Sequence, residues 1–187
     1  ASISVTVTPP PLQPSALVQI NAGQGVTAST FGDNSVVITN TGETEITSVS
    51  LDISTTFMPD IVFDPVGSAG DSLGKCFTPG TGTAATGVDT SGDLCVDPFS
   101  QPHEGNPDNG YDVISMSFTD FEPGESFAFS VDIDPTSIKN DVTTGDAGSV
   151  SGFEMIGATA SVTFGAAGTI DASLRDEGTL GGSAAVV

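Results

Sequence analysis

The chain has 187 residues, with 24 Asp and Glu against 3 Lys and Arg, which gives a formal net charge of −21. This length suits one domain with a core that it can bury unaided. The charge excludes a nucleic-acid binder, because phosphate contacts need a cationic face, and it argues against an anionic membrane surface as partner. No apolar run approaches the roughly 20 residues of a spanning helix, so we expect no membrane insertion.

The first residues of the chain predict a short strand on a stiff arm. Residues 1–8 alternate in polarity, and Ile3, Val5 and Val7 form one apolar edge. The Pro-rich run 9–15 holds the chain extended, so we interpret it as a linker to a single domain over residues 16–187. The strand either pairs within its own domain or completes a sheet of a neighbouring copy, as in donor-strand pili.

Period-two alternation predicts short β-strands through the rest of the chain, whereas helical periodicity is nearly absent. We expect segments 35–39 and 46–54 to form a hairpin or an adjacent-strand pair, with a bulge where the alternation slips between Ile46 and Val49. Together the segments predict an all-β sandwich, jelly-roll or immunoglobulin-like, of about nine to eleven strands. The other expected strands lie at 17–20, 61–63, 113–118, 127–133, 150–164, 170–174 and 184–187.

The alternation stops between Asp64 and Tyr111, in a stretch rich in Gly, Asp, Thr and Pro that we expect to form one long loop. Cys76 and Cys95 lie in it. An even pair in a chain that looks secreted favours a disulfide, which would close a loop of roughly 20 residues and stabilise the fold by about 3 kcal/mol. Two separate buried thiols are the alternative. The small-residue start, such as signal-peptide cleavage leaves, adds to the prediction of an extracellular protein.

Acidic side chains on the same stretch suggest a cation site. Calcium binds carboxylate, carbonyl and water oxygens. The candidate calcium ligands lie on the loop and where it returns to the sheet: Asp89, Asp93, Asp97, Asp108 and Asp112. A purely solvated acidic surface is the alternative, and the sequence requires no cofactor.

Catalytic patterns in the chain are weak. Residues 70–74 match G-x-S-x-G and resemble the block of GDSL hydrolases, but no helical pattern follows Ser72, and the only histidine, His103, lies in a Pro/Gly/Asn-rich stretch. Carboxylate pairs such as Asp132 with Asp134 arise by chance in so acidic a chain, and we expect them at solvated faces or turn caps. We therefore expect a protein that is not an enzyme.

Aromatic residues offer little for sugar stacking, because the chain has no Trp and one Tyr, Tyr111. Phenylalanines such as Phe127 and Phe129 fall on alternating positions and are expected in the core. Calcium-mediated or purely hydrogen-bonded sugar recognition stays open.

Several segments resemble β-sandwich segments that lie beside malectin-type sugar-binding domains in large secreted bacterial proteins. The resemblance spans residues 16–187 and implies an extracellular, non-catalytic module and, by association, a polysaccharide partner. It is carried by residues 18–23, 31–35, 40–42, 121–127 and 132–136.

Two functions follow from these patterns. The first is an extracellular structural subunit that forms a homo-polymer, a filament or surface layer, by donating residues 1–8 to a neighbour. The second is a carbohydrate-binding or adhesive module of a larger secreted protein, which would use the loop 64–111 around Tyr111 for recognition.

Overall fold

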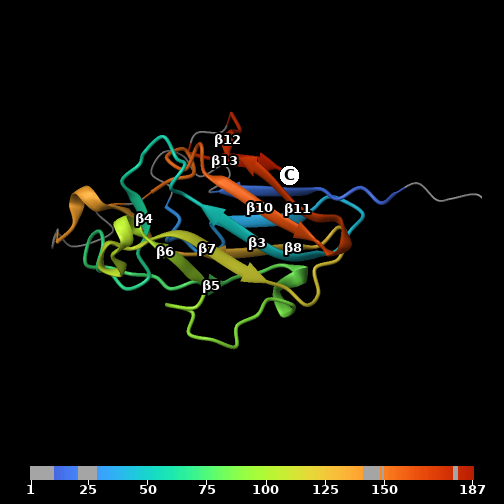
Figure 1. The fold of residues 1–187 in the computed structure, drawn as a ribbon, viewed down its shortest axis with the longest axis horizontal. Helices are drawn as coiled ribbons and strands as arrows, with labels where there is room; N and C mark the ends of the chain where they lie inside the picture. The colour runs from blue at the N-terminus through green and yellow to red at the C-terminus, as the bar shows by residue number, and fades with distance from the viewer. Residues whose placement is uncertain (1–10, 21–28, 141–147, 149, 179–180) are drawn as a thin grey trace, which may run out of the picture.

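Two antiparallel sheets pack face to face in the computed structural model, which describes residues 11–20, 29–140, 148, 150–178 and 181–187 (Figure 1). The predicted all-β sandwich is confirmed. The described residues contain 13 strands, more than expected, because several are only two to four residues long. Strands that short show no alternation in sequence.

The first sheet has six strands. Their spatial order is β12 (Arg175–Asp176), β13 (Ser183–Val186), β1 (Ala16–Ile20), β2 (Val36–Asn40), β8 (Ser126–Ser130) and β5 (Thr78–Pro79).

The second sheet has seven strands. Six follow in the order β11 (Gly168–Ser173), β10 (Thr159–Phe164), β3 (Ile46–Asp52), β7 (Tyr111–Ser117), β4 (Ile61–Phe63) and β9 (Ile133–Pro135), and β6 (Phe99–Pro102) also pairs with β7. Short 3₁₀ turns connect them: η1 (Thr83–Thr86), η2 (His103–Gly105), η3 (Pro107–Asn109), η4 (Thr136–Ile138) and η5 (Gly165–Ala167).

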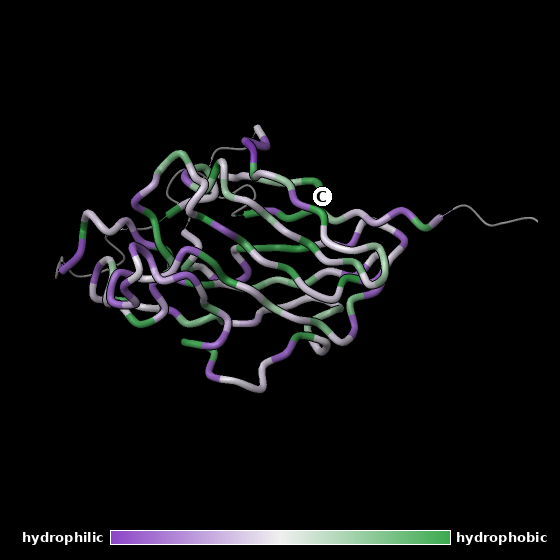
Figure 2. The backbone as a smooth tube through the Cα atoms, viewed as in Figure 1, coloured by the Kyte–Doolittle hydropathy of each residue, from purple (hydrophilic) through white to green (hydrophobic). Residues whose placement is uncertain are grey.

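The core lies between the two sheets, where the inward residues of each strand meet. In β1 and β2 every second residue is buried. Phe127 and Phe129 are fully buried, which confirms them as core residues. The ring of Phe127 meets that of Phe118 edge-on, with centroids 5.2 Å apart. Figure 2 shows the apolar residues along the strands and the polar ones mainly in the connecting loops.

The expected pairing of segments 35–39 and 46–54 is wrong, because β2 and β3 belong to different sheets. The chain crosses between the sheets directly after Asn40, whose side chain is buried. Its amide donates to the carbonyls of Thr44 and Phe121, at 2.9 and 3.1 Å. These bonds satisfy a buried polar group only if the chain turns away from the first sheet.

The predicted bulge is confirmed. Thr163 pairs with Ser48 but Phe164 pairs with Ile46, so one residue of β3 has no opposite partner in β10.

The expected strand 127–133 divides into β8 and β9, which lie in different sheets. Within 150–164, only residues 159–164 form a strand.

The stretch between Asp64 and Tyr111 has more structure than expected. It contributes β5 and β6, which pair with β8 and β7. Among the described residues, no helix is long and apolar enough to span a membrane.

Candidate functional site

We call residues 1–15 the amino-terminal arm, and its last three residues, 13–15, are the root by which it is bound to the domain. Residues 1–8, with Ile3, Val5 and Val7, lie outside the described residues. Further along, the amide of Glu43 donates to the carbonyl of Gln13 at 2.8 Å, and the amide of Thr41 donates to that of Ser15 at 3.0 Å. The end of the expected linker 9–15 therefore extends the ladder between β1 and β2.

Gly42 makes this close approach feasible. A Cβ at residue 42 would lie 2.3 Å from the amide nitrogen of Ser15 and 2.7 Å from the carbonyl oxygen of Gln13. Both neighbours are backbone atoms that cannot rotate away. A side chain here would therefore displace the root of the arm.

The outer strands of the sandwich differ in how they are protected against pairing with another chain. Within the described residues, β5, β6 and β9 contain Pro79, Pro102 and Pro135, and β12 is only two residues long, both charged. By contrast, β11 has six residues, no proline and a single charge, at Asp171. Short length, proline and charge are the usual devices that block strand addition, and β11 has the fewest of them.

The backbone of β11 presents hydrogen-bonding groups along its free edge. Leu174 donates to the carbonyl of Ala158 at 2.8 Å and accepts from the amide of Gly157 at 2.9 Å, so its backbone faces β10. Because these groups alternate in direction along an antiparallel strand, the amides and carbonyls of Thr169, Asp171 and Ser173 face away from β10.

A groove runs along this edge, between β11 of one sheet and β13 of the other. Two hollows of about 740 and 530 Å³ share Thr159, Ser173 and Arg175, and we call them together the edge groove. Exposed apolar side chains lie along it: Val186 is 74% exposed and Phe57 is 82% exposed. The rest of the lining is Thr55, Ile156, Gly157, Asp171, Ala172, Leu174, Asp176, Ala184 and Ala185.

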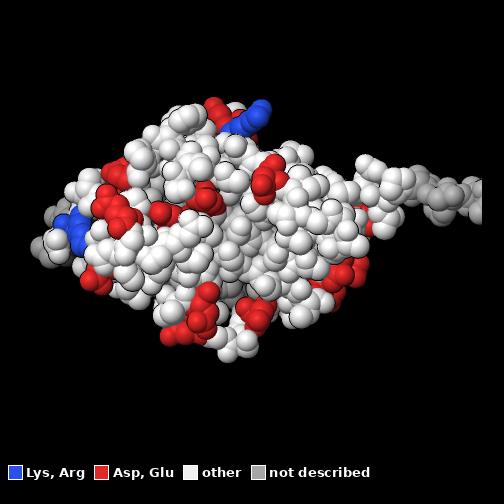
Figure 3. Space-filling model, in the orientation of Figure 1, with Lys and Arg blue, Asp and Glu red and all other residues white. Residues whose placement is uncertain are grey.

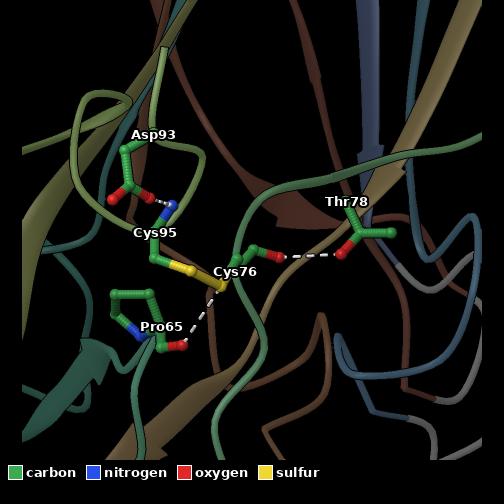
Figure 4. Close-up of a disulfide and its surroundings, with 5 residues drawn as sticks. All are labelled: Pro65, Cys76, Thr78, Asp93 and Cys95. Carbon is green, nitrogen blue, oxygen red and sulfur yellow. Dashed lines mark hydrogen bonds between the residues drawn. A yellow bond between two sulfur atoms is a disulfide. The ribbon is translucent and has the colours of Figure 1, made fainter. Parts of the chain in front are cut away.

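The disulfide between Cys76 and Cys95 is present, as predicted, with Cα atoms 4.4 Å apart (Figure 4). It joins the segment before β5 to a tight turn, in which the Asp93 carboxylate accepts a bond from the amide of Cys95 at 3.0 Å. The carbonyl of Cys76 also accepts a bond from the hydroxyl of Thr78 at 2.9 Å. The bridge thus ties two parts of the long excursion to each other.

The structure does not bring the candidate calcium ligands together as one site. Within the described chain, no group of three or more His, Cys, Asp or Glu side chains is arranged to hold a metal. Asp97 accepts a bond from the amide of Asp93 at 2.8 Å, and Asp112 lies 2.7 Å from Nδ1 of His103. Asp108 lies elsewhere, where its carbonyl accepts a bond from Lys139. Calcium binding stays a prediction.

Asp89 caps its own turn. Its carboxylate accepts a bond from the amide of Ser91 at 2.9 Å, and this bond lowers the pKa of Asp89 below its ordinary value. Asp89 and Asp97 line a cavity of about 210 Å³. Three serines also line it: Ser91, Ser115 and Ser117. The rest of the lining includes Phe77, Leu94, Pro98 and Met116.

Two carboxylates expected at solvated faces or turn caps are buried. Asp132 and Asp134 are 3% and 1% exposed, so they do not lie on a solvated face. Asp134 accepts a bond from the amide of Asp71 at 3.0 Å, and a Cβ at Gly70 would lie 2.1 Å from that of Asp134. Asp134 therefore supports the turn that follows β4.

Asp64 is the residue at the centre of that turn, and sequence reasoning missed it. It is fully buried, and it accepts bonds from the amides of Ser68, Ala69 and Gly70 at 2.8–2.9 Å. The small residues four to six positions after an aspartate are the signal that could have identified this turn.

The residues of the hydrolase-like pattern have local roles. Ser72 lies exposed in the turn after Asp71, whereas His103 lies on η2 and pairs with Asp112. Tyr111 is half-buried, and its ring centroid lies 5.7 Å from that of Phe99, so it packs against the core.

No family model, curated protein or solved structure matches this chain. Figure 3 shows the visible face with red carboxylates in separate groups, mainly towards its margins, and a broad uncharged area between them.

Proposed function

We propose that this chain is an extracellular structural subunit, which assembles head to tail into a filament or surface layer by donating residues 1–8 to a neighbouring copy. The observation that carries the proposal is the bound root of the arm. Gln13 and Ser15 are held beside Glu43 and Thr41 at one end of the sandwich. An alternating segment that continues from a fixed point at one end is suited to reach an adjacent molecule.

The distribution of charge favours contact through the arm. Residues 1–14 contain no charged side chain, although the whole chain carries a net charge of −21. Copies of so acidic a protein repel one another over a Debye length of about 8 Å at physiological ionic strength. An uncharged ribbon adds no further repulsion when it makes the contact.

The apolar edge of the ribbon would supply the binding free energy. Full burial of each of Ile3, Val5 and Val7 is worth about 1.5–3 kcal/mol before the cost of ordering the arm. The disulfide is the support for an extracellular location, because such bonds persist in oxidising compartments.

Removal of residues 1–8 tests the proposal. We expect the truncated protein to sediment as a folded monomer under conditions in which the full chain forms polymers visible by electron microscopy. A matched pair of variants separates chemistry from length. We expect serine at Ile3, Val5 and Val7 to abolish assembly, and alanine at Ser2, Ser4 and Thr6 to preserve it. Normal polymerisation of the truncated protein contradicts the proposal.

A second candidate function is carbohydrate binding through the excursion 64–111. The cavity beside Asp89 and Asp97 favours it, because carboxylates and serine hydroxyls hydrogen-bond to sugar hydroxyls. Binding on a glycan array that is lost in Ser115→Leu, inside the cavity, and kept in Ser100→Leu, on exposed β6, would support this function. A protein that stays monomeric at high concentration would also favour it over the polymer.

A further inference from the structure

We propose that residues 1–8 of one copy add as a new strand to the free edge of β11 in the next copy, over the edge groove between β11 and β13. This inference rests on the proposed function and names the surface that receives the donated strand.

The free edge of β11 has the chemistry that strand addition needs. The amides and carbonyls of Thr169, Asp171 and Ser173 face away from β10, and the described residues place no strand beside them. An incoming backbone would satisfy these groups in the same way as a strand of the sheet. The prolines of β5, β6 and β9 disfavour the same reaction at those edges.

The groove suits the arm in chemistry, and the edge of β11 suits it in length. Small side chains, Ala172, Ala184 and Ala185, line it beside the exposed Val186, so they leave room for branched apolar residues. A six-residue strand such as β11 is about 20 Å long, and eight extended residues span about 26 Å. Ile3, Val5 and Val7 alternate along that length.

The position of the groove fits a head-to-tail arrangement. The root of the arm lies by Glu43, in the turn before β3, whereas Phe57 follows the far end of β3. In Figure 1 the described start of the chain (blue) accordingly lies at the opposite end of the sandwich from β4. An arm that leaves one copy at the Glu43 end therefore meets the groove of the next copy at its Phe57 end.

This geometry sets the direction of the donated strand. Residue 8 would lie near Phe57 and residue 1 deeper along the groove, towards the end where β11 begins. The strand would thus run parallel to β11 and antiparallel to β13. The contact is heterologous, because the arm and the groove are different surfaces of the chain, and each bound copy still offers its own arm or groove to a further copy.

A proline in β11 tests the acceptor edge. The amide of Asp171 faces away from β10, so Asp171→Pro removes a donor that the sheet does not use, and the subunit should fold. We expect this variant on its own, without wild-type protein, to lose assembly. The matched control Asp171→Ala removes the charge, keeps the amide and should assemble. Equal assembly of both variants overturns the inference.

A peptide measurement separates this inference from the proposed function. The probe is the synthetic peptide of residues 1–14, added to subunits that lack residues 1–8. We expect saturable binding that Asp171→Pro weakens at least tenfold and Asp171→Ala does not. Binding that is indifferent to Asp171→Pro places the acceptor elsewhere and leaves strand donation standing. No peptide binding, with normal assembly of the truncated subunit, overturns strand donation itself.

Cross-linking tests the contact even if the proline variant fails to fold. Subunits with Thr6→Cys are mixed with subunits carrying Asp171→Cys and treated with a short bis-maleimide, to which the disulfide of Cys76 and Cys95 is inert. We expect covalent dimers with Asp171→Cys and none with Thr78→Cys, on the opposite edge strand β5. The reverse pattern contradicts docking on β11.

Discussion

Gln13 and Glu43 are joined by a pair of reciprocal hydrogen bonds. The amide of Gln13 donates to the Glu43 carboxylate at 3.2 Å, and the amide of Glu43 donates to the Gln13 carbonyl at 2.8 Å. Residues that are 30 positions apart in the chain thereby hold Gln13 against the turn before β3.

Gly42→Ala should loosen this contact without unfolding the domain. The new methyl group would overlap the backbone of Gln13 and Ser15, and such overpacking typically costs about 1–3 kcal/mol. Amide exchange at Glu43 should accelerate, and the free energy of unfolding in urea should fall by that amount. Gly32→Ala, whose new methyl group would meet the Ser29 carbonyl oxygen at 3.3 Å, is the comparison and should leave exchange at Glu43 unchanged. Unchanged exchange at Glu43 would show that the arm root tolerates a side chain.

Asp64→Asn should destabilise the turn after β4. The carboxylate accepts three backbone bonds, whereas the amide group of asparagine would place donors against donors. An unsatisfied buried group costs about 1–3 kcal/mol, and urea denaturation would measure the loss. Asp93→Asn, at an exposed turn, should cost less than about 0.5 kcal/mol. Equal effects of the two substitutions would contradict a special role for the buried turn.

Replacing both cysteines by alanine should lower the free energy of unfolding by about 3 kcal/mol, because the bridge reduces the conformational entropy of the unfolded chain. The measurement is denaturation of the wild type and the double variant, without and with a reductant. Under reducing conditions the two proteins should converge. A difference that persists after reduction would mean that the thiols pack in the core and matter for that reason.

Lys75 and Asp33 should couple stability to pH. Nζ of Lys75 lies 2.8 Å from the Asp33 carboxylate, and this bond holds the pKa of Asp33 below its ordinary value of 3.8. The stabilisation is therefore fully present above pH 3.8 and is lost as the pH falls through the lowered pKa of the folded state. Asp33 is largely exposed, so salt should weaken the effect.

An NMR titration of the Asp33 carboxyl carbon checks this coupling. In Lys75→Met the titration midpoint should rise towards the ordinary value. The control is Lys139→Met, which should leave the midpoint unchanged, because Nζ of Lys139 donates to the carbonyl of Asp108 instead. An identical midpoint in the wild type and Lys75→Met would rule out the ion pair as the cause.

Alternation identified the strands whose two faces meet different surroundings. In β3 the buried Val49 and Leu51 alternate with half-buried residues, and the slip after Ile46 marks the bulge opposite β10. Such a pattern depends on the local chain alone, so it is visible in sequence.

Features that depend on distant partners could not be predicted in this way. Asn40 directs the chain into the second sheet through a bond to Phe121, which lies 81 residues away. Asp134 is held by the amide of Asp71, 63 residues earlier. The edge groove likewise exists because β11 and β13 end up as neighbours in different sheets, which is a property of the strand order.

The central position of β1 has a mechanical consequence. It lies between β2 and β13, and the ladder to β13 reaches from Ile20 to the mutual bonds of Ala16 and Val187. A pull on residues 11–15 acts along β1, so it loads both ladders in shear at once instead of unzipping them bond by bond. The sandwich is thus built to resist tension applied through its amino-terminal end.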